Sequence, residues 1–353
     1  MMMNPADLIP IADPIAVPWQ WFQALLLAGF FIHLLVMNAM LGTALICLAE
    51  RLRPGRRPSP GHEVMARQLP FIIAFTINAG IVPLLFLQVL YGNFIYTSSI
   101  LMARWWMGAI PVLLAVYAGA YWHRGISDSR AGLKLTVLAA TVVCMLAMAF
   151  VLTNNMTLML MPETWRRYFQ NPGGSLLNLD NPMFWPRYLH MLTGALAMGG
   201  LFRAVVGRWR LHRGNREGSV LVKSGLGWFV AGSALQVGVG FWLLLALRTE
   251  VMTLMLGRDP RATTLLIAAL AGAGLALMFA IQARVLPAVA AALTTVGAMV
   301  LIRDVVRRAY LDGYFVPEQL QYTTRYGPFL FFLFFLIAGG AVLYHLYRRI
   351  RPS

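Results

Sequence analysis

Two of the six histidines lie inside long apolar stretches, and this setting limits what their side chains can do. His33 lies in the sequence FFIHLL, and His190 lies in WPRYLHML. The other four lie near charged residues: His62, His123, His212 and His345. An imidazole in hydrocarbon needs a partner for its ring nitrogens. His33 and His190 are therefore either packing residues bonded to a backbone carbonyl or axial ligands of a b-type heme iron.

Other side chains could complete a heme site on the same side of the membrane as His190. Arg187 and Arg104 are expected at that level, where a guanidinium can pair with a heme propionate or with a lipid head group. Met252 and Met255, in the sequence EVMTLM, are candidates for a sixth ligand. Because the chain has 20 methionines, most of them are expected to serve only in packing.

The elements that must position these residues are membrane-spanning helices. Hydrophobic residues make up 59% of the 353 residues and charged residues only 12%, which is unlike a soluble domain. Stretches near the length needed to cross a bilayer predict an all-α fold, a polytopic integral membrane bundle of about nine transmembrane helices. The predicted ranges are 21–48, 69–91, 105–122, 135–153, 188–206, 224–247, 264–283, 286–302 and 327–346.

The distribution of basic residues predicts which way the bundle faces. The net charge is +16, and most of the 29 basic residues fall in alternate connections. These basic stretches are 51–67, 124–134, 208–223, 284 and 348–351. The positive-inside rule then predicts an N-terminus outside and a C-terminus inside. We interpret the positive charge as a determinant of topology and as a means of contacting anionic lipid head groups, so no nucleic acid partner is expected.

The chain divides into three predicted parts. Residues 1–20 form an outer N-terminal segment, residues 21–210 form a five-helix half with the two candidate histidines, and residues 211–353 form a four-helix half. The C-terminal half carries the predicted outer loops 248–263 and 303–326.

Several function classes find no support in the residues. All thirteen acidic residues, Asp304 included, are expected in connections or at helix ends, so a proton-coupled pump or cation-driven transporter lacks an intramembrane relay. Cys47 and Cys144 belong to no Cys-x-x-Cys pattern, which argues against a disulfide framework and a covalent c-type heme. The motifs of phosphate loops, serine hydrolases and zinc proteases are missing.

Three short motifs carry a resemblance to a known family. They are NAGIVP at 78–83, TNNM at 153–156 and RYLH at 187–190, together with His33 in the first predicted helix. On these motifs, residues 20–210 resemble the large heme-bearing subunit of cytochrome bd-type quinol oxidases, as a short and divergent relative. The resemblance implies that His190 ligates a low-spin heme b and that His33 corresponds to the histidine at the oxygen-reacting site. It also implies a multi-pass protein of a bacterial or archaeal inner membrane.

The sequence also departs from that family. The short connection Arg248–Thr263 stands where the family has a long outer quinol-binding loop, which leaves the quinone site open. The Gly-Arg-Gln-Pro-Trp signature is absent, and Arg303–Asp312 takes its approximate place. The third predicted helix, Trp105–Trp122, contains no acid to match the family's glutamates. A complete oxygen reductase is therefore not expected.

Together these observations predict a membrane subunit of a respiratory electron-transfer complex that binds one or two hemes b. It would pass electrons between the quinone pool and a redox partner on the outer face, such as a c-type cytochrome, as the membrane subunit of a quinol-linked oxidoreductase. Two alternatives stay open. One is a heme-free membrane anchor for other subunits, and the other is a small-molecule transporter that uses Asn78, Pro83, Gln88 and Gln236 near the midplane.

Overall fold

The computed structural model is helical almost throughout. The described residues are 9, 10, 12–53, 60–170 and 172–350. Much of the predicted outer segment 1–20 lies outside these ranges, as do three basic residues expected on the inner side: Arg56, Arg57 and Arg351. Within the described ranges, the one β pairing is an isolated parallel bridge between Ile15 and Tyr322.

Eleven α-helices follow one another in the described part of the chain. They are α1 (Trp19–Arg51), α2 (Pro60–Leu101), α3 (Ala103–Met107), α4 (Ala109–Gly125), α5 (Ala131–Met159), α6 (Phe184–His212), α7 (Gly218–Leu245), α8 (Thr249–Thr253), α9 (Pro260–Ile281), α10 (Val285–Leu311) and α11 (Tyr326–Ile350). With α3 and α4 joined as one span, nine helices among the described residues are long and apolar enough to cross a membrane. The predicted all-α polytopic membrane bundle is confirmed.

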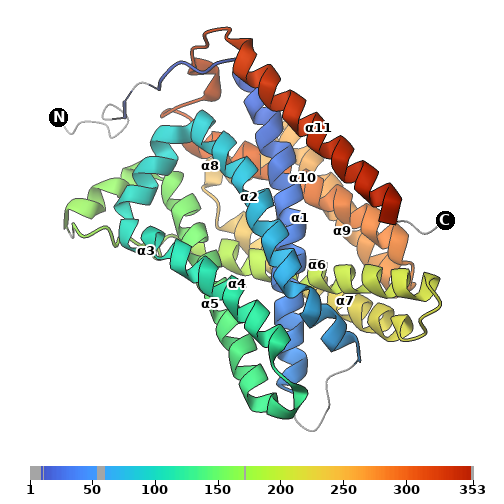
Figure 1. Ribbon diagram of the computed structural model, residues 1–353. Helices are drawn as coiled ribbons and strands as arrows, with labels where there is room; N and C mark the ends of the chain where they lie inside the picture. The colour runs from blue at the N-terminus through green and yellow to red at the C-terminus, as the bar shows by residue number, and fades with distance from the viewer. Residues whose placement is uncertain (1–8, 11, 54–59, 171, 351–353) are drawn as a thin grey trace.

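The helices alternate in direction, so the connections gather at two ends of the bundle. We call the end with the connections 126–130, 213–217 and 282–284 the basic end, and the end with the segments 160–183, 246–259 and 312–325 the loop end. Helix α1 contacts α2, α5, α6 and α10 and lies in the middle, whereas α11 lies along the outside (Figure 1). Which side of the membrane each end faces stays a prediction.

Helix α10 continues beyond its predicted end at residue 302, and that boundary was wrong. Asp304 forms ion pairs with Arg307 and with Arg308, one turn further along the same helix. The Arg303 guanidinium stacks over the Phe30 ring of α1 at 4.1 Å. Because these side chains find partners within the bundle, the helix tolerates them and ends only at Leu311. The expectation that every acid lies in a connection or at a helix end is therefore wrong for Asp304.

Helix α2 is bent where the sequence predicted its end. Tyr91 has non-helical dihedral angles, φ −131° and ψ 34°, and Pro83 lies two turns before it. A proline removes one hydrogen bond of the helix and favours a bend. After Tyr91 the helix continues to Leu101, so the predicted boundary at residue 91 marks a kink inside one long element.

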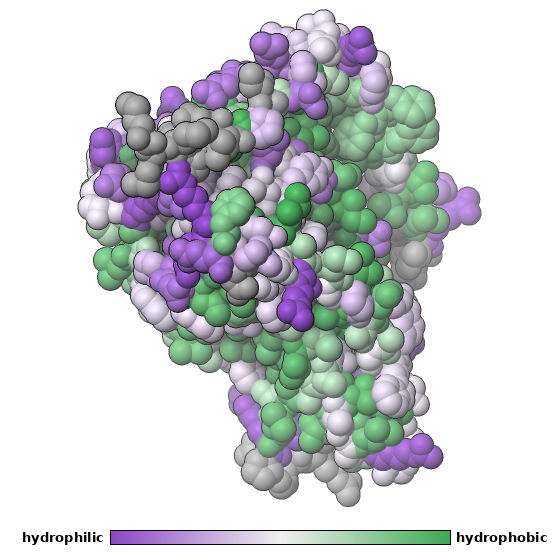
Figure 2. All heavy atoms as spheres, turned by 90° about the vertical axis from the view of Figure 1, so that its left-hand side faces the viewer, coloured by the Kyte–Doolittle hydropathy of each residue, from purple (hydrophilic) through white to green (hydrophobic). Residues whose placement is uncertain are grey.

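The apolar interior forms separate clusters along the bundle. One cluster at the loop end draws on both predicted halves, with Leu90, Phe94, Met255 and Tyr310 among its buried members. Outside the bundle, Figure 2 shows a broad zone of hydrophobic residues between a hydrophilic group at the upper left and another at the bottom. Such a zone is what a lipid-facing surface requires.

Helices α1 and α6 cross with their backbones in contact. A Cβ atom added at Gly42 of α1 would fall on the carbonyl of Ala195, and it would lie 2.8 Å from the Gly199 Cα atom of α6. Small residues at such crossings let transmembrane helices pack closely. This crossing fixes α1, which carries His33, against α6, which carries His190.

We expect Gly42→Ala to destabilise the protein, because the added methyl group must force α1 and α6 apart. Overpacking of this kind costs about 1–3 kcal/mol. Gly238→Ala is the matched control, since a Cβ atom at Gly238 meets nothing within 4 Å. Thermal unfolding in detergent measures both variants. Equal melting temperatures for the two would contradict the close crossing.

Candidate functional site

His33 lies in the middle of α1, with its ring against α2. Its Nδ1 atom is 3.2 Å from the carbonyl oxygen of Thr76. A Cβ atom added at Gly80 would lie 2.9 Å from His33 Cε1. The missing side chain of Gly80 therefore makes the room in which the His33 ring lies, and the backbone hydrogen bond fixes the direction of the ring.

His190 lies in the second turn of α6, because α6 begins at Phe184, earlier than predicted. Its Nε2 atom accepts a hydrogen bond from the side-chain amide of Gln236 on α7, at 2.9 Å. The Gln236 carbonyl oxygen accepts from the Thr193 hydroxyl. The Nδ1 atom of His190 is buried and has no hydrogen-bond partner among the described residues. A Cβ atom at Gly240 would approach the same ring to 3.3 Å.

Two half-buried arginines, Arg187 and Arg303, lie near the histidines without a carboxylate partner among the described residues. Arg187 is one turn before His190, and its Nη2 atom lies 3.2 Å from the Met183 sulfur. Arg303 contacts the Phe30 ring, while the nearby acid Asp304 is paired with other arginines. A cation so placed retains its capacity to bind an anion.

Arg303 connects the surroundings of the two histidines. Its charge acts on His33 of α1 and also repels the charge of Arg187 on α6. Helix α10 thus places one guanidinium within electrostatic reach of both predicted ligand helices. The result is a positively charged region inside the bundle, in its half nearer the loop end.

The other predicted site residues are not brought to this region by any contact in the structure. Arg104 is exposed on the short helix α3, where its backbone nitrogen donates to the Gly174 carbonyl at 2.8 Å. Met252 is half-buried on α8. Met255 is 1% exposed and packs in the apolar cluster at the loop end.

Reading the sequence missed two side chains of the site, for different reasons. Arg303 was assigned to a loop because the apolar stretch ends at residue 302. The spacing of Asp304, Arg307 and Arg308 on one helix face was the available signal that the helix continues. Gln236 was noted only as a polar residue of a possible transport route, since its contact with His190 depends on how α6 packs against α7.

The described part of the chain has no group of three or more His, Cys, Asp and Glu side chains that could hold a metal ion. This finding concerns sites built from several protein ligands. A heme iron takes at most two axial ligands from the protein, so the relevant features are single histidines in apolar surroundings with a cationic neighbour.

The comparisons with known proteins bear on the fold. No protein-family model matches the sequence, and no curated protein matches it. Among solved structures, the chain is similar to the bd oxidase from Geobacillus thermodenitrificans, with a TM-score of 0.67 and 13% sequence identity. The fold is bd oxidase-like.

The match covers 95% of this chain and 99% of the bd oxidase chain. It therefore includes the C-terminal half, where the sequence motifs no longer supported a resemblance. At 13% identity, the likeness concerns the fold alone.

We expect Arg303→Gln to stabilise the heme-free protein, because burial of the Arg303 charge and its repulsion by Arg307 and Arg187 outweigh its attraction to Asp304. A gain of about 1 kcal/mol would raise the melting temperature by roughly 2–4 °C. Arg307→Gln is the matched control on the same helix, and it should lower the melting temperature because it breaks the pair with Asp304. Protein produced under heme limitation is the sample. A lower melting temperature for Arg303→Gln would contradict this electrostatic account.

Proposed function

We propose that the protein is a heme b-binding membrane subunit of a respiratory electron-transfer complex, with His190 as the axial ligand of a low-spin heme. The observation that carries the proposal is the buried His190 ring, whose Nδ1 atom has no hydrogen-bond partner among the described residues, one turn after Arg187, which forms no ion pair there. The bd oxidase-like fold supports the same assignment. When bound, a heme b would supply one-electron transfer, with a potential tuned by its ligand, burial and nearby charge.

The residues around His190 fit such a group. The buried Nδ1 atom without a partner shows that the ring's hydrogen-bonding capacity is only half used. His190 would hold the iron through its imidazole, one nitrogen of which faces the Gln236 amide in this structure. The glycines at 240 and 194 let these two side chains lie against the facing helix, because a Cβ atom at Gly240 would approach His190 to 3.3 Å and one at Gly194 would approach Gln236 to 3.2 Å.

Arg187 and Arg303 are proposed to bind the heme propionates. Each propionate is an anion, and a guanidinium matches a carboxylate with two parallel hydrogen bonds. Arg187 lies on the ligand helix itself, and Arg303 takes the role first expected of Arg104. The carboxylates would offset the repulsion between the two arginines, to which Asp304 alone supplies an opposing charge at Arg303.

His33 is proposed to ligate a second heme. Gly80 makes room for its ring, and the bond from its Nδ1 atom to the Thr76 carbonyl leaves Nε2 as the nitrogen for iron. Arg303, within electrostatic reach of His33, provides charge near both proposed sites. Met252 and Met255 remain proposed only as alternative sixth ligands.

The loop end is proposed to face outside the cytoplasm and to exchange electrons there with a c-type cytochrome. A cavity of about 200 Å³ at this end is proposed for the quinone head group. Its lining offers both hydrogen-bond donors and acceptors, from Tyr310, Arg248, Glu163 and Asn181. Tyr310 is within electrostatic reach of Arg187, so this cavity adjoins the proposed propionate site.

A heme-free membrane anchor is the second candidate. The observation that favours it is that both histidines already have partners in the chain, His33 with the Thr76 carbonyl and His190 with Gln236. A transporter has less support. Asn78 donates to the Ala74 carbonyl of its own helix at 2.8 Å, and Gln236 is held by two side chains.

The deciding measurement is a dithionite-reduced minus air-oxidised visible spectrum of the detergent-purified protein. We expect a b-type α-band that is lost in His190→Ala and changed separately in His33→Ala. His212→Ala is the control, because His212 is exposed at the basic end. A folded parent that stays colourless when heme is supplied would overturn the heme proposal and favour the anchor.

We further expect Arg187→Gln and Arg303→Gln to lower the heme midpoint potential. Removing a cation near the heme stabilises the more positive ferric state relative to the ferrous state. A tenfold change in the one-electron equilibrium corresponds to about 59 mV, and shifts on the order of this size are expected. Potentiometric titration provides the measurement. Arg307→Gln serves as control, since Arg307 is already paired with Asp304, and an equal shift there would argue against specific propionate binding.

A further inference from the structure

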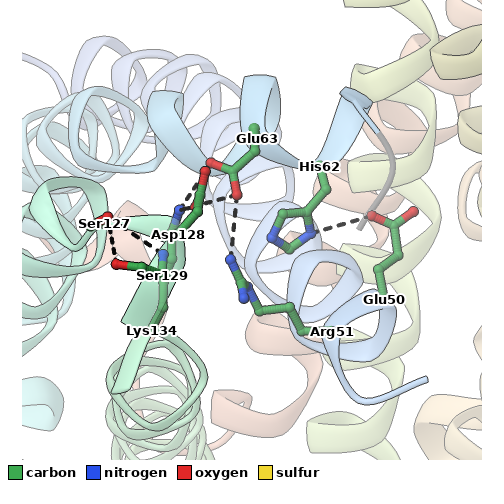
Figure 3. Close-up of polar contacts among 8 residues, drawn as sticks. All are labelled: Glu50, Arg51, His62, Glu63, Ser127, Asp128, Ser129 and Lys134. Atoms are coloured by element: carbon green, nitrogen blue, oxygen red, sulfur yellow. Dashed lines mark hydrogen bonds and ion pairs between the residues drawn. The ribbon is translucent and has the colours of Figure 1, made fainter. Parts of the chain in front are cut away.

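Ion pairs at the basic end tie α1, α2 and α5 together (Figure 3). Glu63 accepts hydrogen bonds from Arg51 at 3.3 Å and from Lys134 at 3.1 and 3.2 Å. Lys134 also donates to Asp128 at 2.6 Å. Both Glu63 and Asp128 thus already have basic partners within the chain.

A second set of pairs lies deeper in the bundle, beside the first. Glu50 is 2.8 Å from Arg203 of α6, and its other oxygen is 3.5 Å from Nδ1 of His62. His62 is fully buried. With these contacts, every carboxylate of the two sets has at least one cationic or imidazole partner, so none is free to neutralise a further base.

A cavity of about 230 Å³ opens beside the first set of pairs, where α2 begins, α4 ends and α5 begins. Its lining combines buried side chains with side chains at the surface of the basic end. The lining residues are Glu63, Ala66, Arg67, His123, Arg124, Ile126, Ser127, Asp128 and Lys134.

His123 is the least satisfied residue of this cavity. Its side chain is 1% exposed, and neither ring nitrogen has a hydrogen-bond partner among the described residues. The charged groups around it are Lys134 of α5, Arg51 of α1 and Glu63 of α2, with His62 also near. Because buried polar atoms are nearly always hydrogen-bonded, a ring left this way and lining a cavity indicates a place for a ligand.

The charge of the cavity indicates the sign of that ligand. Arg67 and Arg124 line it and form no ion pair with an acid of the described residues. Arg124 instead stacks over the exposed Phe71 ring at 5.1 Å. The two acids of the lining are already paired with Lys134. The remaining bases and a buried ring with donor capacity fit an anion, and arginine is well suited to a phosphate.

The position of the cavity indicates where the phosphate comes from. It lies at the ends of membrane-spanning helices, where lipid head groups lie. Next to it, α2 and α4 present exposed rings along the lipid-facing surface: Phe71 is 50% exposed, and Trp122 is 60% exposed. Aromatic rings at this level are typical of the membrane interface.

We propose that this cavity binds the phosphate head group of a membrane phospholipid, held by Arg67, Arg124 and His123. The acyl chains lie along α2 and α4 beside Phe71 and Trp122. The proposal does not depend on heme binding, because the cavity lies at the opposite end of the bundle from Arg187. A bound lipid would bridge α2, α4 and α5 and so stabilise the folded protein.

The test uses delipidated full-length protein in detergent. Native mass spectrometry measures binding of dimyristoyl phosphatidylglycerol, and phosphorus NMR measures binding of inorganic phosphate. The test variant is Arg67→Gln/Arg124→Gln, with Arg208→Gln/Arg216→Gln as control. The control removes two exposed bases from the same end but away from the cavity. We expect at least tenfold weaker lipid binding in the test variant and parent-like binding in the control.

Three results would overturn the proposal. An equal loss of lipid binding in the test and control variants would mean that binding depends only on the net charge of the basic end. Phosphate binding as tight as lipid binding, and lost in the same test variant, would mean a free phosphate site. Binding of dimyristoylglycerol as tight as that of the phospholipid would mean that the phosphate is not recognised.

His123→Phe provides a second variant, because it removes both ring nitrogens and keeps an aromatic ring in the buried position. We expect it to weaken lipid binding severalfold without unfolding the protein. Comparing phospholipid, phosphate and dimyristoylglycerol on the parent alone needs no variant, so the proposal stays testable even if a variant fails to fold. Parent-like lipid binding by a folded His123→Phe would remove His123 from the site.

Discussion

The free-energy cost of an unsatisfied polar group in hydrocarbon is the constraint on which the rest of this structure depends. It makes the backbone helical wherever the chain crosses the bilayer, because only a helix satisfies its own peptide groups there. It also decides which side chains can lie within the bundle. Asp304 lies inside α10 because Arg307 and Arg308 neutralise it, and Glu50 lies near the end of α1 because Arg203 does the same there, with His62 beside its other oxygen.

The same constraint explains how much could be predicted. The nine spans follow from hydropathy, since a long apolar stretch in a chain of this composition has one stable outcome. The boundary at residue 302 failed because hydropathy treats each charge as isolated, whereas ion pairs one turn apart let a helix continue. The boundary at residue 91 found a real break in α2, but Tyr91 bends the helix and does not end it.

The candidate site was harder to predict, because it depends on helix packing. The sequence indicates that His33 and His190 are unusual, and it places Arg187 one turn from His190. It cannot indicate that Gly80 is the residue beside His33, or that Gln236 contacts His190, since those pairs lie on different helices. Arg303 joins the site only through the packing of α10 against α1 and α6. Whether these residues bind heme stays a prediction.

The excess of basic over acidic residues explains why several basic side chains of this structure form no ion pair. A chain with 29 bases and 13 acids must leave many bases without an acidic partner. At the surface of either end this costs little, because water and lipid head groups solvate the charge. Arg187 and Arg303 are different, since they are half-buried, close enough to repel each other, and form no ion pair with an acid of the described residues, although Asp304 attracts Arg303. The two carboxylates of the proposed heme would supply an anion at this position, which is why the charge balance of the chain and the proposed cofactor are argued together.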